Sequence, residues 1–349
     1  MNKILPPTKR IMQVLLLCLT CVSFSILSAC GEDASLPPSG GSGDYTFVEN
    51  SEADSSQSLE ETITEEPVPS AEPADSKGSR DNTPICLVPE APGTVTYGNE
   101  SVTIDASNIS EGYLCVSYLG NCPKVKLQIT GPDGVTYTYN LTGNGFEVFP
   151  LTGGNGGYSA GIYENISGTQ YATCFYQELS VTLTDEFSPF LYPSQYVNFT
   201  PQSQAVAKAE ELSAPANTDL DVVSNVYNFV ISSITYDYDK ASNIASGYLS
   251  SVDETLRTGT GICLDYAALM ASMLRSQGIP THLEVGYAQD AYHAWISTYV
   301  DEKGWVNGII EFDGTSWSLM DPTFAANSSE KSLKKFIGDG SNYTVKYVY

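Results

Sequence analysis

A cysteine, a histidine and an aspartate in the C-terminal half of the chain have the types and order that nucleophilic catalysis requires. Cys263 begins an apolar stripe of helical spacing, directly after the small, turn-prone residues 258–261. A thiol in the first turn of a helix faces unpaired N–H groups and the positive end of the helix dipole, which favour the thiolate. His293 and Asp321 follow on strand-like runs, so a base and a group to orient it are available. The order predicts a Cys-His-Asp site.

Each of these residues also has a structural interpretation. A free cysteine in a helix is usually a small core residue, and a histidine can be a hydrogen-bonded core residue. Asp321 precedes a proline, where a turn-forming aspartate is common. Asp265 faces away from Cys263 by helical spacing and is expected to be structural. Further rival carboxylates are Asp290 and Asp313, and the other histidine, His282, is expected on the sheet surface.

Three sequence blocks resemble the transglutaminase-like superfamily, which is related to the papain-type cysteine proteases. The blocks are G-x-C-x-D-Y-A from Gly261, H-A-W from His293 and D-P-T from Asp321, in the order of that family. The resemblance covers roughly residues 201–349 and implies Cys263 as nucleophile, His293 as base and Asp321 as the residue that orients the base. It implies no cofactor and no metal.

The sequence predicts one of the two hydrogen-bond donors of an oxyanion site and leaves the second open. The backbone N–H of Cys263 is one expected donor to a developing oxyanion. Tyr236 and Tyr227 are alternatives for the second donor. Trp295, two residues past His293, is expected either to shield the catalytic pair or to pack in the core.

Helices and strands in the predicted order position these residues. Helices are expected over 203–213 and from Thr218, which is spaced from Asp221 like a capping box. Alternating runs at 281–287, 292–296 and 343–349 predict strands, the last of them at a sheet edge. The fold class is therefore α+β, with a transglutaminase-like (papain-like) domain over 202–349 after a connector at 187–201.

A different pattern precedes this domain. Short alternating runs broken by turn residues fill residues 84–186, and residues 131–134, Gly-Pro-Asp-Gly, read as a hairpin turn. The pattern predicts an all-β sandwich, with Ig-like topology as the specific expectation. It contains no motif that carries chemistry.

The cysteines outside the predicted site are candidates for disulfide bonds. Four of them fall in the predicted β domain, an even number that favours two disulfides with the pairing left open. These candidates are Cys86, Cys115, Cys122 and Cys174. A metal site at Cys115 and Cys122 is the alternative, but the spacing is poor and the domain has no histidine.

The N-terminus predicts export and membrane attachment. Residues 1–29 combine basic residues with a short apolar run, as a secretory signal does. The sequence around Cys30 resembles a bacterial lipobox, which implies that Cys30 is lipidated and anchors the protein. Residues 30–83 are rich in Ser, Pro and acidic residues and predict a disordered tether. The formal net charge of −25 argues against nucleic acid as a partner.

The combined expectation is a lipid-anchored, extracytoplasmic cysteine enzyme that acts on amide bonds of a protein or peptide, cell-wall-associated substrates included. Hydrolysis is favoured over amine transfer, because water needs no second binding site. The alternatives are a non-catalytic surface binding protein with the same fold, and a peptidoglycan or glycan binder that uses the β domain.

Overall fold

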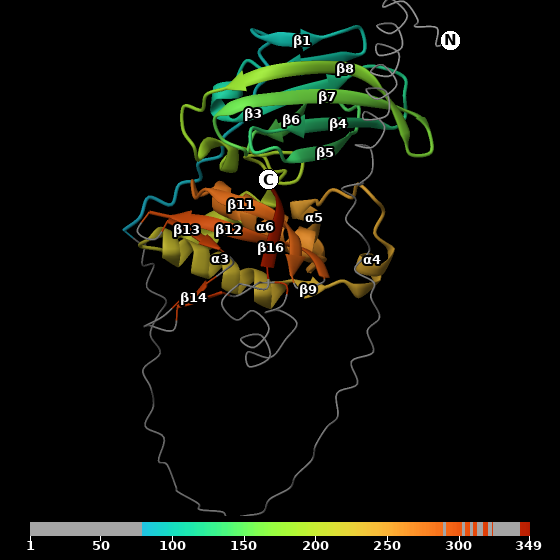
Figure 1. Ribbon diagram of the computed structural model, residues 1–349. Coiled ribbons are helices and arrows are strands. Elements are labelled where there is room, and N and C mark those ends of the chain that lie inside the picture. The colour runs from blue at the N-terminus through green and yellow to red at the C-terminus, as the bar shows by residue number, and fades with distance from the viewer. Residues whose placement is uncertain are drawn as a thin grey trace, which may run out of the picture. The chain divides into compact units, whose positions relative to one another are not determined.

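A computed structural model describes residues 79–288, 291–301, 304–307, 310–312, 317–319, 323 and 343–349. The described residues form two compact units, one of residues 90–189 and one that joins 79–89 to 190–349 (Figure 1). The predicted signal peptide, Cys30 and most of the predicted tether lie outside the described residues. No helix in the described ranges is long and apolar enough to span a membrane.

The first unit is all β. Its strands form two four-stranded antiparallel sheets, ordered β1-β2-β3-β6 and β5-β4-β7-β8. The strands are β1 (Thr96–Gly98), β2 (Val102–Asp105), β3 (Tyr113–Tyr118), β4 (Val125–Thr130), β5 (Thr136–Leu141), β6 (Glu147–Pro150), β7 (Gly156–Ser167) and β8 (Gln170–Val181). A short 3-10 helix, η1 (Ile109–Glu111), precedes β3, and another, η2 (Ser188–Phe190), ends the unit.

Alternation explains how these sheets form a core. Along β4, Val125, Leu127 and Ile129 are buried while the residues between them are partly exposed. The two sheets share this core, because Tyr139 of β5 packs edge-on against Phe149 of β6, with ring centroids 4.8 Å apart. The predicted all-β region is present, and the turn at 131–134 joins β4 to β5 as expected. The Ig-like topology stays a prediction.

The second unit mixes helices and strands. A four-stranded antiparallel sheet, ordered β13-β12-β11-β16, is its main sheet. Helices and strands are α2 (Gln204–Ser213), α3 (Asp219–Ser233), β9 (Thr235–Tyr236), α4 (Tyr238–Asn243), α5 (Val252–Thr258), β10 (Thr260–Gly261), α6 (Cys263–Arg275), β11 (Thr281–Ala288), β12 (Ala291–Val300), β13 (Gly304–Asn307), β14 (Ile310–Phe312), β15 (Trp317–Leu319) and β16 (Tyr343–Val348). Strand β16 lies at the sheet edge, as predicted.

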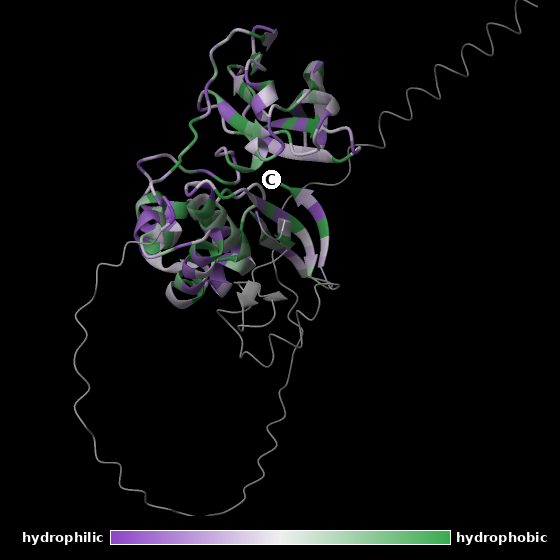
Figure 2. Ribbon diagram, turned by 90° about the vertical axis from the view of Figure 1, so that its left-hand side faces the viewer, coloured by the Kyte–Doolittle hydropathy of each residue, from purple (hydrophilic) through white to green (hydrophobic). Residues whose placement is uncertain are grey.

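Helix α6 is the centre of this unit. Every residue of α6 is buried, and the helix packs against α2, α3 and α5 as well as β11 and β12. The helices around it carry both hydrophobic and hydrophilic stretches, as amphipathic surface helices do (Figure 2). Arg275, at the end of α6, donates to the carbonyls of Tyr192, Thr281 and Tyr349 at 2.7–2.9 Å. These bonds tie the end of α6 to β11 and to the end of the chain's last strand.

The helix starts follow their sequence signals. The side chain of Thr218 accepts from the N–H of Asp221, and Asp221 accepts from the N–H of Thr218, which is the predicted capping box. Helix α2 begins at Gln204, one residue after the predicted start at 203. Residues 252–258 form helix α5, which the sequence did not predict.

Residues 79–89 differ from the sequence prediction, which placed 79–83 in the tether and 84–89 in the β domain. They pack on the second unit. Arg80 Nε pairs with an oxygen of Asp219 at 2.6 Å, and Asn82 Nδ2 donates to the Ala216 carbonyl at 3.2 Å. Ile85 N–H donates to the Ser276 carbonyl at 2.7 Å. The polar composition that suggested a solvated tether supplies these hydrogen bonds instead.

Candidate active site

Cys263 is the first residue of α6. Its side chain is a free thiol in a residue that is 8% exposed, so it is close to the surface but largely enclosed. The first N–H groups of a helix have no intrahelical acceptor, so they and the helix dipole point towards this end. The expected position of the candidate nucleophile is therefore the observed one.

The start of α6 is fastened to the preceding segment by backbone pairing. Strands β9 and β10 are parallel, with Thr260 opposite Thr235 and Gly261 opposite Tyr236. The N–H of Asp237 donates to the Gly261 carbonyl at 2.9 Å. This pairing holds Thr260 and Gly261, which lead into the helix, on the strand that follows α3.

Asp265 adds a side-chain anchor at the same place. This residue is fully buried and accepts from the Ile262 N–H at 2.9 Å, which caps the helix. It also accepts from Lys240 Nζ at 2.6 Å and from the Tyr248 hydroxyl at 2.7 Å. A side chain on Gly261 would collide with Asp265, because an added Cβ would lie 2.7 Å from the Asp265 Cβ. The expectation that Asp265 is structural agrees with this arrangement.

His293 lies on β12, opposite Gly286 of β11. It is 6% exposed, and its ring is nearly parallel to that of Trp295, at 19° and 6.1 Å between centroids. Tyr343 of β16 packs edge-on against Trp295 at 5.1 Å. Trp295 thus packs beside the candidate base, which is compatible with both of its predicted roles.

The elements that carry Cys263 and His293 are packed together. Helix α6 contacts β12 directly. Burial raises the pKa of the Tyr292 phenol, and the neighbouring ionisable side chains of Tyr347, Tyr196, Tyr287 and Cys263 add to the rise. Cys263 therefore lies within electrostatic range of the residue next to His293. Asp321 and its rivals Asp290 and Asp313 lie outside the described residues.

The observed position of His282 differs from the sequence prediction. It was expected on the sheet surface, but its side chain is only 16% exposed. Its ring stacks on Trp305 at 3.6 Å and packs on Phe190 at 4.0 Å. Burial lowers its pKa, and the neighbouring Glu284 carboxylate, at 3.5 Å, opposes that shift. The alternation of the strand was read correctly, but this face of the sheet is covered.

The cysteines of the predicted disulfides are all free thiols in the structure. Cys86 belongs to the second unit, whereas the other three lie in the β unit. Cys115 is buried in β3, where its Sγ lies 3.5 Å from the Glu90 carbonyl. The sequence shows an even number of cysteines but does not show which unit each cysteine belongs to.

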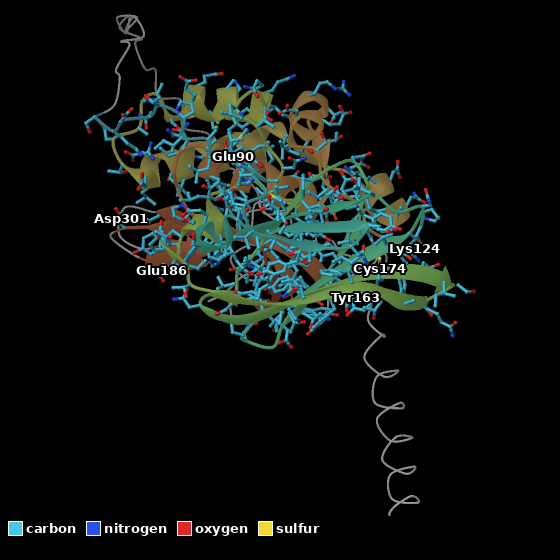
Figure 3. The ribbon with its side chains drawn as sticks, turned by 90° about the horizontal axis from the view of Figure 1, so that it is seen from above. Glu90, Lys124, Tyr163, Cys174, Glu186 and Asp301 are labelled. Atoms are coloured by element: carbon cyan, nitrogen blue, oxygen red, sulfur yellow. The ribbon has the colours of Figure 1, made fainter. Side chains whose placement is uncertain are left out.

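Cys122 and Cys174 are near each other. Cys122 Sγ contacts the carbonyls of Lys124 and Asn165 at 3.3 and 3.7 Å. Burial raises the pKa of the Cys174 thiol, and the neighbouring Glu164 carboxylate and Cys122 thiol add to the rise. Figure 3 shows Cys174 and Lys124 in the same part of the β unit.

Among the described residues, no group of three or more His, Cys, Asp or Glu side chains is placed to hold a metal ion.

Lys240, Tyr248 and Tyr266 also support the site, although the sequence did not predict this role for them. The Tyr266 hydroxyl donates to the Ile234 carbonyl at 2.6 Å. Of these three residues, only Tyr266 belongs to a motif seen in the sequence, the G-x-C-x-D-Y-A block.

Comparison with known proteins relates residues 206–308 of the second unit to a protein family. Residues 206–308 match the model of the transglutaminase-like superfamily. The UPF0252 protein of Methanocaldococcus jannaschii is 33% identical over 96 residues, which cover 24% of this chain and 27% of that protein. The match thus spans about a quarter of that relative's length.

Solved structures give weaker likenesses. A candidate cysteine protease of Cytophaga hutchinsonii is 17% identical, with TM-score 0.31 over 66% of this chain and 69% of that one. The periplasmic domain of TgpA from Pseudomonas aeruginosa is 16% identical, with TM-score 0.28 over 66% and 97% of the two chains. Red sea bream transglutaminase is 13% identical, with TM-score 0.23 over 60% and 48%. Scores this low carry no argument. The match to the family model confirms the resemblance over residues 206–308, a transglutaminase-like core that includes the blocks at Gly261 and His293 but not the D-P-T block at Asp321.

Proposed function

We propose that this protein is a cysteine enzyme that acts on amide bonds of proteins or peptides through a thioester. Cys263 is the nucleophile, His293 the general base and Asp321 the residue that orients the base. The observation that carries the proposal is the placement of Cys263 at the first position of α6, in a transglutaminase-like core whose α6 packs on the strand of His293.

The steps follow from these residues. His293 accepts the thiol proton, and Cys263 Sγ attacks the amide carbonyl carbon to give a tetrahedral oxyanion, which the N–H groups at the start of α6 stabilise. The C–N bond then breaks, His293 returns the proton to the leaving amine, and a thioester remains. Water, deprotonated by His293, attacks the thioester, and the acid product leaves with the thiol restored.

Hydrolysis is the preferred second half of the reaction, because water needs no binding site of its own. Amine transfer differs only in the nucleophile that resolves the thioester. To distinguish the two, wild type and Cys263→Ala are incubated with a peptide library and a labelled amine. Cleavage without label, dependent on Cys263, supports hydrolysis; incorporated label supports transfer. If neither product forms, the result favours a non-catalytic surface protein.

The proposed location rests on the N-terminal sequence. Cys30 follows a signal-like segment and a lipobox-like run, so we place the enzyme outside the cytoplasm, anchored by lipid on Cys30. More than one acyl chain is needed for a stable anchor, since each buried CH₂ contributes about 0.8 kcal/mol. Metabolic labelling with a fatty-acid analogue tests this, with Cys30→Ser as the control that should lose the label.

A further inference from the structure

A buried ionic cluster lies beside the candidate nucleophile and has no role in the proposed chemistry. It consists of Asp265, Lys240 and Tyr248. The Asp265 carboxylate accepts from Lys240 Nζ at 2.6 Å, from the Tyr248 hydroxyl at 2.7 Å and from the Ile262 N–H at 2.9 Å. Lys240 also donates to the Tyr248 hydroxyl at 2.6 Å and lies over its ring, 4.5 Å from the centroid.

The cluster joins three separate stretches of chain. Lys240 comes from α4, Tyr248 from the segment between α4 and α5, and Asp265 from the first turn of α6. Asp265 is fully buried, whereas the Lys240 side chain is 30% exposed. A buried carboxylate is costly unless it is paired and its oxygens accept hydrogen bonds, and both conditions hold here. The cluster therefore favours one arrangement of these stretches around the start of α6.

Burial and the charge of Asp265 raise the pKa of the Tyr248 phenol, so this hydroxyl keeps its proton and remains a donor to Asp265. The hydrogen bond from Tyr248 therefore holds Asp265 in place.

We propose that Asp265, held by Lys240 and Tyr248, is the positioning residue for Cys263. The inference rests on the proposed function. By capping the Ile262 N–H, Asp265 keeps the first turn of α6 closed, so that the thiol of Cys263 stays at the helix N-terminus and facing β12. Without the cap the first turn opens, and the thiol loses the environment that makes it reactive.

The chain contains a matched control. Asp221 has the same place in α3, the third helical residue, and caps it by accepting from the N–H of Thr218 at 3.0 Å. Asp221→Ala thus removes the same kind of cap from the same unit without touching the start of α6. Any general effect of losing a helix cap appears in both variants.

The test measures the rate at which iodoacetamide labels Cys263, followed peptide by peptide because the described part of the chain holds other free thiols. Asp265→Ala is expected to lower the rate at pH 6 about tenfold and to move the pH profile upward, since thiolate fraction controls the rate. Asp221→Ala is expected to leave both unchanged.

A double mutant tests whether the cluster acts as a unit. If Lys240 works through Asp265, adding Lys240→Met to Asp265→Ala lowers the rate no further than Asp265→Ala alone. Should Asp265→Ala prove unfolded by circular dichroism, Tyr248→Phe takes its place, because it removes one hydrogen bond and leaves no unpaired charge. It is expected to lower the rate about twofold.

The proposal is overturned if Asp265→Ala, or Tyr248→Phe in its place, labels with the wild-type pH profile, or if the Lys240 and Asp265 effects add. This result differs from failure of the proposed function. If the proposed function fails, wild-type Cys263 itself labels slowly at pH 6, and His293→Ala does not change the labelling rate of Cys263.

Discussion

Replacing Arg275 by methionine is expected to destabilise the second unit by about 1–3 kcal/mol. Arg275 is fully buried and donates to three backbone carbonyls. Burial lowers its pKa to about 9, so the guanidinium is still charged at neutral pH. The carbonyl of Tyr349 keeps the Leu283 N–H as a donor at 2.9 Å. The buried carbonyl of Thr281 loses the guanidinium, and a buried acceptor left unpaired costs about 1–3 kcal/mol.

Tryptophan fluorescence during urea unfolding measures this effect selectively, because all three tryptophans fall within residues 295–317 of the second unit. Arg275→Lys keeps the charge but cannot reproduce the planar fork, so we expect an intermediate loss. Arg257→Met is the control, since Arg257 is exposed and pairs with Glu254 of its own helix. An Arg275→Met midpoint equal to that of Arg257→Met would refute the reasoning.

Three further outcomes are expected. Burial lowers the pKa of His282, so as the pH falls below about 6.5 the unfolded state binds a proton that the native state does not bind. The free energy of unfolding therefore falls by up to about 1.4 kcal/mol per pH unit. His282→Gln should flatten that slope in urea titrations at pH 7.5 and 5.5. Oxidised glutathione should join Cys122 to Cys174 before any other pair, with the glutathione reduced; mass mapping that finds another first pair contradicts this. Gly286→Ala should weaken the pairing of β16 by about 1–3 kcal/mol, because its Cβ would lie 2.0 Å from the Thr344 carbonyl oxygen; unchanged hydrogen exchange in β16 would count against it.

Local signals in the sequence predicted most of the elements around the site. The Thr218 capping box, the turn at 131–134 and the alternation along β11 and β12 depend on residues a few positions apart. Their physics is contained in short windows, so the pattern specifies the structure. The position of Cys263 at the start of α6 was predicted in the same way.

The contacts that fasten these elements could not be predicted. Lys240 and Asp265 are 25 positions apart, and nothing in the intervening sequence marks them as an ion pair. Arg275 reaches a carbonyl 83 positions away, at Tyr192. Arg80 lies in a stretch whose composition reads as a tether, yet it pairs with Asp219. Such contacts depend on tertiary placement, which charge and periodicity do not encode.

Labelling of Cys263 by iodoacetamide at pH 6, in wild type and in His293→Ala, tests the central claim most directly. The chain has only two histidines, so His282→Gln serves as the matched control. If the imidazole of His293 takes up the thiol proton, wild type and His282→Gln label rapidly and His293→Ala labels at least about tenfold more slowly. Equal rates in all three proteins would contradict a Cys263–His293 pair and leave a transglutaminase-like core without the proposed chemistry.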